Sequence, residues 1–178
     1  GTRVMETRNV GSFDTPLRVA DEIPAEIQVP KMVQICNEHG IYMKEHNADY
    51  LSDEALEWHP RLGIHAANIA PEFGVVETKA MLAIFEKNGL QKHADNFLEL
   101  SYASGKWKKW MIDGSNSTNR DRSIIAGHYI FSKPEWQQIK IEAESILNKK
   151  GIDLNKQLRE SIKGAIFRYM SNFRLVKI

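Results

Sequence analysis

Three groups of polar residues, each following a strand-like stretch of sequence, could together form one binding or catalytic site. The first group is Glu6-Thr7-Arg8-Asn9, the second runs from Glu45 to Tyr50, and the third comprises His65, Asn68 and Glu72. Imidazole and carboxylate groups bind divalent cations, and amides and carboxylates bind sugar hydroxyl groups. The residue types therefore predict a metal or sugar site where the three groups meet.

Within these groups the side-chain chemistry suggests individual roles. The candidate metal ligands are His46 and His65, and the candidate substrate-binding residues are Arg8, Asn9, Asn47, Asp49 and Asn68. Structural alternatives stay open, because a histidine at a strand end is often only hydrogen-bonded, Asp49 could cap a turn and Glu6 could pair with Arg8. Side chains alternate along a strand, so Glu45 and His46 share one side only if the strand has already ended.

The first half of the chain has the elements needed to position such a site. Strands are expected at 2–6, 41–43 and 64–69, and helices at 25–39, from Ser52 to about Pro60, and from Pro71 to about Gly89. Strands that alternate with helices predict a parallel sheet with right-handed crossovers. Ligands bind beyond the carboxyl ends of such strands, where the three polar groups lie.

The second half, residues 90–178, reads as all helical. Leu154, Leu158, Ile162, Ile166 and Met170 recur every four residues, which is typical of an amphipathic helix. The polar run at 114–119 predicts a loop. Two tryptophans interleave with lysines in Lys106–Trp110, which fits either a nucleic-acid surface or a packed face with solvated lysines, and we favour packing. We therefore expect the chain to divide into two parts, residues 1–89 and residues 90–178.

Composition excludes several classes of protein. The chain has 178 residues, and 24 Lys and Arg nearly balance 23 Asp and Glu, so bulk charge does not favour a nucleic-acid partner. No apolar run is long enough for a membrane span, and the single Cys36 fits a reducing, cytoplasmic compartment. Phosphate-binding loops, nucleotide-binding glycine motifs, nucleophile elbows and CxxC pairs are absent.

The residues Glu45–Leu51 and Ile64–Glu72 resemble the C-terminal half of the class II D-tagatose-bisphosphate aldolase non-catalytic subunit family, some of whose members are labelled tagatose 6-phosphate kinase. The resemblance continues in the second half of the chain. It includes Lys106–Trp110, the pair Asp121-Arg122, and the last helix with Arg168-Tyr169.

The wider class II aldolases suggest a chemistry for two of these stretches. His46–Asp49 is similar to a stretch whose histidine binds zinc, and Asn68–Glu72 to one whose asparagine contacts the substrate. The resemblance thus implies that His46 holds a divalent metal such as zinc and that Asn68 contacts a sugar phosphate. Such a metal acts as a Lewis acid on a ketose carbonyl, and an acid/base is also needed, for which Glu45 and Glu6 are the candidates.

The resemblance also implies a fold, namely the C-terminal portion of a (β/α)8 TIM barrel, with about three parallel strands, followed by an all-helical extension. A full barrel takes about 250 residues. We therefore expect an open sheet edge that a missing N-terminal half, a catalytic aldolase subunit or an oligomer would cover.

Three functions follow as hypotheses. The first is an accessory subunit of a class II ketose-bisphosphate aldolase in carbohydrate metabolism, which binds a sugar phosphate or stabilises a catalytic partner. The second is a metal-dependent sugar-phosphate aldolase, a lyase, or an epimerase in its own right. The third is an inactive barrel fragment.

Overall fold

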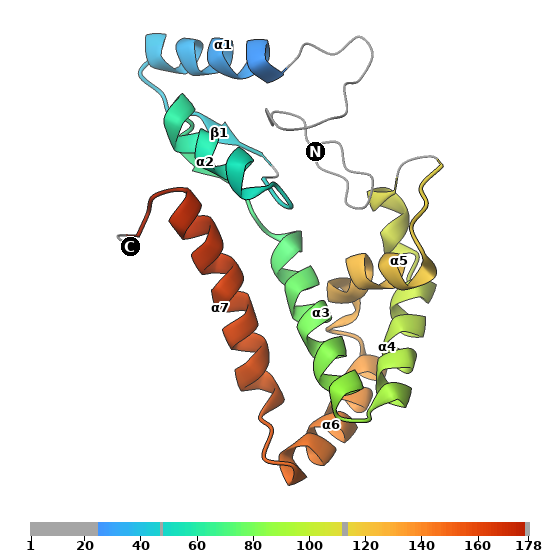
Figure 1. Cartoon of the computed structure of the whole chain (residues 1–178). Helices are drawn as coiled ribbons and strands as arrows, with labels where there is room; N and C mark the ends of the chain where they lie inside the picture. The colour runs from blue at the N-terminus through green and yellow to red at the C-terminus, as the bar shows by residue number, and fades with distance from the viewer. Residues whose placement is uncertain (1–24, 47, 112–113, 177–178) are drawn as a thin grey trace. The chain divides into compact units, whose positions relative to one another are not determined.

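The computed structural model describes residues 25–46, 48–111 and 114–176 (Figure 1). The described chain forms two compact units. The first unit contains the residues up to Ala70 together with those from Ile166 onward, and the second runs from Pro71 to Ala165. The expected division at residue 89 therefore differs from the one that the contacts make.

The first unit is built around one short strand–helix–strand element. Its parts are α1 (Ala25–Glu38), β1 (Lys44–Glu45), α2 (Asp53–Leu62), β2 (Ala66–Ala67) and the last part of α7 (Leu154–Asn172). The strands β1 and β2 are parallel, with Lys44 opposite Ala66 and Glu45 opposite Ala67. The helix α2 thus connects two parallel strands, as the sequence predicts for this stretch.

Local sequence signals set both ends of α2. The Ser52 hydroxyl accepts a hydrogen bond of 3.1 Å from the Ala55 amide, which satisfies one of the free N–H groups at the start of the helix. Gly63 ends the helix with φ of 80°, a left-handed conformation that glycine adopts without steric cost. Pro60 lies inside the helix and does not end it, so the helix continues to Leu62 and is capped by Gly63.

The second unit consists of helices. They are α3 (Pro71–Lys87), α4 (Gln91–Ala103), the 3-10 helix η1 (Lys106–Trp110), α5 (Asn119–Ala126), the 3-10 helix η2 (Gly127–Ile130), α6 (Pro134–Lys149) and the first part of α7. Phe85, Phe97 and Trp136 form its aromatic core, and each is at most 2% exposed. The ring centroids of Phe97 and Trp136 are 4.8 Å apart in an edge-on arrangement, which favours attraction between the rings.

The helices α3 and η2 meet at a contact that only glycine permits. A Cβ atom built on Gly127 would lie 2.5 Å from the Thr78 hydroxyl oxygen and 3.0 Å from the Phe97 ring. Thr78 is fully buried, and its hydroxyl donates a hydrogen bond of 2.8 Å to the Gly74 carbonyl. The Thr78 side chain therefore has little room to move away.

We expect Gly127→Ala to lower the free energy of unfolding by about 1–3 kcal/mol, because the added methyl group overpacks this contact. Gly164→Ala is the matched control, since nothing lies within 4 Å of its Cβ position in the helix α7. That control is expected to gain about 0.5–1 kcal/mol from better helix propensity. Urea unfolding of both variants measures the difference, and equal stabilities would contradict the packing argument.

The predicted TIM-barrel portion is wrong. In the described part of the chain the strands β1 and β2 have two residues each, and most of the other residues lie in helices. The predicted strand 41–43 precedes β1, and Ile41 and Tyr42 are exposed rather than buried. The predicted strand 64–69 shrinks to Ala66–Ala67, and the one at 2–6 lies outside the described residues. Short apolar runs do not distinguish a buried strand from a loop, which explains the error.

The prediction that the second half of the chain is helical is confirmed by the helices α4 to α7. The four-residue apolar repeat predicts α7, and its first two members, Leu154 and Leu158, are buried. Among the described residues, no helix combines the length and the apolar character that crossing a bilayer requires.

Candidate functional site

The carboxyl ends of β1 and β2 bring several predicted site residues together. The Asn68 amide donates to the Glu45 carbonyl at 3.2 Å, and the Ala48 amide donates to the Asn68 carbonyl at 2.9 Å. Asn68 thus lies beside the chain that runs from Glu45 through His46. The positions of these residues at strand ends predict this meeting, although the sheet has far fewer residues than expected.

Glu45, a candidate acid/base, forms an ion pair with His59 inside the first unit. The pair joins Glu45 Oε2 to His59 Nε2, and the two side chains are 10% and 6% exposed. The other ring nitrogen of His59, Nδ1, lies 3.0 Å from the Ala55 carbonyl, and the Phe173 ring lies 5.2 Å from the imidazole. The Glu45 carboxylate is therefore directed at a structural partner.

The sequence reasoning missed His59. It lies on α2, one turn after Ala55, with no polar motif around it. The only local signal is that a histidine in the last turn of a helix interacts well with the helix dipole.

The surroundings of His59 shift its pKa upward. Burial lowers the pKa, but the hydrogen bond and the negative charge of Glu45, together with the backbone carbonyl of Ala55, outweigh burial. The net effect raises the pKa of His59 above 6.5. These contacts therefore favour the protonated form of His59.

This shift predicts a pH dependence for the first unit. Because the pKa of His59 is higher in the folded than in the unfolded state, its stabilising contribution is complete below the unfolded pKa of about 6.5. The contribution is lost as pH rises through the raised, folded pKa. We expect the stability of the first unit to fall as pH rises above about 6.5.

Urea unfolding between pH 5 and pH 9 measures this loss. The unfolding is followed by Trp58 fluorescence, in a variant in which the other three tryptophans are replaced by phenylalanine. His59→Gln is the control and should flatten the profile in this range. An unchanged slope in that variant would assign the pH dependence to another group.

Asp49 and His65 both serve the local backbone. Asp49 is 2% exposed, and its Oδ1 accepts a hydrogen bond of 3.0 Å from the Ala70 amide. His65 is exposed, and its Nδ1 accepts a hydrogen bond of 3.3 Å from the Met43 amide. Its ring also lies 4.8 Å from that of Tyr42. These contacts fit the structural alternatives that the sequence left open.

The two candidate metal ligands lie at opposite ends of the small sheet. His46 follows β1 at its carboxyl end, whereas His65 precedes β2 at its amino end. By the register of the two strands, His65 lies opposite Met43, which is three residues before His46. Three residues span about 10 Å along a strand. Nowhere in the described ranges do three or more His, Cys, Asp or Glu side chains gather closely enough to hold a metal ion.

Four further candidates, Glu6, Arg8, Asn9 and Asn47, lie outside the described residues. Their proximity to the strand ends stays a prediction. Of the described candidates, Glu45, His46, Asp49 and Asn68 lie at one end of the sheet, and His65 lies at the other.

The C-terminal part of α7 holds the loop that follows β1. The Arg168 guanidinium donates from Nε to Asp53 at 2.7 Å and from a terminal nitrogen to the Leu51 carbonyl at 2.7 Å. Asn172 also donates to Asp53, at 2.9 Å, and the Tyr169 hydroxyl donates to the Ala48 carbonyl at 3.3 Å. Arg168 and Tyr169, which the resemblance singled out, therefore fix the backbone of 48–53.

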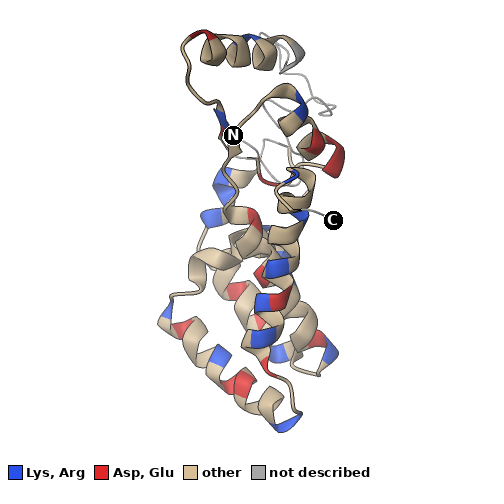
Figure 2. Ribbon diagram, turned by 90° about the vertical axis from the view of Figure 1, so that its left-hand side faces the viewer, with Lys and Arg blue, Asp and Glu red and all other residues tan. Residues whose placement is uncertain are grey.

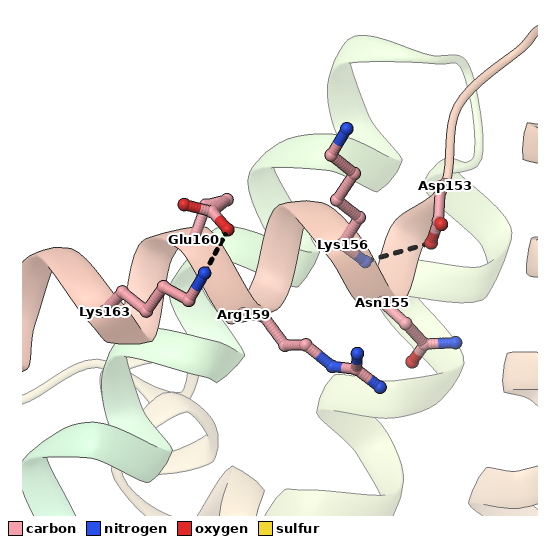
Figure 3. Close-up of a pocket in the computed structure, with 6 residues that line it drawn as sticks. All are labelled: Asp153, Asn155, Lys156, Arg159, Glu160 and Lys163. Atoms are coloured by element: carbon pink, nitrogen blue, oxygen red, sulfur yellow. Dashed lines mark hydrogen bonds and ion pairs between the residues drawn. The ribbon is translucent and has the colours of Figure 1, made fainter.

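The second unit has a polar surface pocket of about 500 Å³ at the start of α7 (Figure 3). It is lined by Asp153, Asn155, Lys156, Arg159, Glu160 and Lys163. The Lys163 ammonium pairs with Glu160 at 2.7 Å, and Asp153 accepts a hydrogen bond from the Lys156 amide. Both signs of charge also alternate along the helices of this unit (Figure 2). Three cationic and two acidic side chains thus line an open surface pocket in which Lys163 is paired with Glu160.

Comparisons with known proteins add no relative. No protein-family model matches the chain, and neither a search of curated proteins nor a search of solved structures finds a match.

Proposed function

We propose that this protein is a non-catalytic subunit that binds and stabilises a class II ketose-bisphosphate aldolase in carbohydrate metabolism. The motifs at 45–51 and 64–72 support the choice of partner through their resemblance to the accessory subunit family. The observation that carries the proposal is an uncovered apolar face on α1.

The helix α1 is apolar on two sides, and only one side is packed. Val29 and Cys36 are buried on the packed side. On the other side Ile27, Met32 and Ile35 are 45–50% exposed, and Ile41 and Tyr42, just beyond the helix, are 56% and 83% exposed. Polar residues such as Gln28 and Lys31 lie among these exposed apolar side chains. A group of exposed apolar residues rimmed by polar ones is suited to a protein partner.

The internal contacts of the strand-end residues support binding over catalysis. Glu45 pairs with His59, Asp49 caps the Ala70 amide, and His65 accepts from the Met43 amide. A general acid or base must be within hydrogen-bond reach of substrate, and these groups are directed at the protein itself. The motif that resembles the aldolases thus serves to shape the first unit.

A binding measurement tests the proposal. The double variant Met32→Ser/Ile35→Ser removes apolar area from the exposed face of α1, and we expect it to weaken binding to a purified class II tagatose-bisphosphate aldolase catalytic subunit by at least about tenfold. The control is Ile141→Ser/Ile146→Ser on α6, which removes exposed apolar residues of the second unit. Unchanged binding by the α1 variant would contradict the proposal.

Two measurements distinguish an aldolase from two other occupants of this face of α1, namely a second copy of the chain and residues 1–24. Light scattering that shows a dimer of the chain alone, dissociated by the α1 variant, would assign the face to a second copy. If removal of residues 1–24 were needed before the aldolase could bind, the face would belong to that segment. Either result would overturn the proposed interface.

The metal-dependent alternative is tested by elemental analysis. A stoichiometric divalent ion that is lost in His46→Ala, without loss of fold, would favour an enzyme and contradict a purely accessory role.

A further inference from the structure

The second unit carries a cluster of cations and aromatic rings on η1, α5 and η2, which we call the η1 cluster: Lys108, Lys109, Trp107, Trp110, Arg122 and His128. In a 3-10 helix, residues three apart share a face, so Trp107 and Trp110 lie on the same side of η1. The Arg122 guanidinium from α5 lies 4.8 Å from the centre of the Trp107 ring. The cluster thus joins residues of three elements.

The lysine ammonium groups of the cluster face rings instead of carboxylates. Lys109 lies 5.2 Å from the Trp110 ring and 4.7 Å from the Tyr129 ring, and Lys108 lies 6.0 Å from the Trp107 ring. Among the described residues, neither lysine nor Arg122 has a carboxylate at ion-pair distance. The nearby acid Asp121 is instead hydrogen-bonded to Thr118. Within the described residues, the three cations Lys108, Lys109 and Arg122 therefore gather without a paired carboxylate.

Three buried polar atoms in the same cluster also lack hydrogen-bond partners among the described residues. They are Trp110 Nε1, Arg122 Nε and His128 Nδ1. Two of them are N–H donors, and leaving a buried donor unpaired costs about 1–3 kcal/mol. Native proteins carry few such groups, and a bound ion or ligand is one physical reason for them.

We propose that the η1 cluster binds a phosphate group, either as free phosphate or as the phosphomonoester of a small molecule. The planar guanidinium of Arg122 is preorganised by its contact with Trp107, and such a fork matches phosphate oxygens. Lys108 and Lys109 supply two more positive charges for a dianion. The site lies in the second unit, so the inference goes beyond the proposed partner of the first unit and does not depend on it.

The ring contacts disfavour a nucleic acid as the ligand. Tyr102 already stacks on Trp107, with ring centroids 5.3 Å apart and planes 20° apart, and the Trp107 N–H donates to the Tyr102 carbonyl at 3.0 Å. Proteins that bind single strands offer free aromatic faces to successive bases. A base would have to displace contacts that the chain makes with itself.

Tryptophan fluorescence of the full chain tests the site, because Trp107 and Trp110 lie within it. Inorganic phosphate and fructose 1-phosphate are titrated against sodium chloride at matched ionic strength. We expect a saturable change with at least one phosphate compound, and tighter binding of fructose 1-phosphate would identify a sugar phosphate as the source. No saturable change beyond that of chloride would overturn the proposal.

Two variants and one control make the assignment specific. Lys108→Gln/Lys109→Gln should weaken phosphate binding by about tenfold, and Arg122→Lys, which keeps the charge but loses the fork, should also weaken it. The matched control is Lys156→Gln/Lys163→Gln, which removes the same charge from the pocket on α7. Equal weakening by both lysine pairs, or tighter binding of a single-stranded RNA than of phosphate, would contradict the site. Circular dichroism of each variant shows that the fold is retained.

Discussion

Glu45→Ala is expected to lower the free energy of unfolding of the first unit by about 1–3 kcal/mol, because it leaves the His59 imidazole nitrogen Nε2 buried without its partner. Both side chains of the pair are at most 10% exposed, so water cannot replace the lost carboxylate. Unfolding followed by Trp58 fluorescence, in the background where the other three tryptophans are phenylalanine, measures the loss.

The control for this prediction is Glu57→Ala on the helix α2. Glu57 pairs with Arg61 at 3.1 Å, but both side chains are about half exposed, and such surface pairs contribute about 0–1 kcal/mol. The double variant Glu45→Ala/His59→Leu should recover part of the stability, because it leaves no unpaired imidazole nitrogen in the interior. Equal effects of Glu45→Ala and Glu57→Ala would contradict the buried pair.

Phe97→Ala is expected to destabilise the second unit by about 3–5 kcal/mol. Phe97 is fully buried, and its ring lies 4.8 Å from that of Trp136 and 6.1 Å from that of Phe131. Truncation removes these contacts and leaves a cavity that the surrounding helices cannot close.

Guanidinium unfolding followed by circular dichroism at 222 nm measures this loss. Ile141→Ala, which truncates a side chain that is 59% exposed, should change stability by less than about 0.5 kcal/mol. A Phe97 variant as stable as this control would show that the aromatic core is not formed as described.

Much of the helical structure was predictable because its signals are local. Ser52 caps α2, Pro134 opens α6, and the apolar repeat from Leu154 marks α7. The strands were not predictable to the same degree. Ile41-Tyr42-Met43 has the composition of a buried strand, yet Ile41 and Tyr42 are exposed and the paired strand begins at Lys44.

The site was predictable only in part. Parallel pairing brought Glu45, His46 and Asn68 together, as expected from their positions after strands. The partner of Glu45 was not predictable, because His59 lies on a helix with no motif around it. The contact of Arg168 with Asp53 joins residues 115 positions apart, and no local pattern in a single sequence indicates such a pairing.

The role that we propose for the protein is to stabilise an aldolase and not to cleave a sugar itself. The most direct measurement is the cleavage of tagatose 1,6-bisphosphate by the chain alone, by a class II aldolase catalytic subunit alone, and by the two together after incubation at 45 °C. We expect no cleavage by the chain alone and a longer half-life of the catalytic subunit in the mixture, an effect reduced by Met32→Ser/Ile35→Ser. Chelator-sensitive cleavage by the chain alone, or an unchanged half-life in the mixture, would contradict this role.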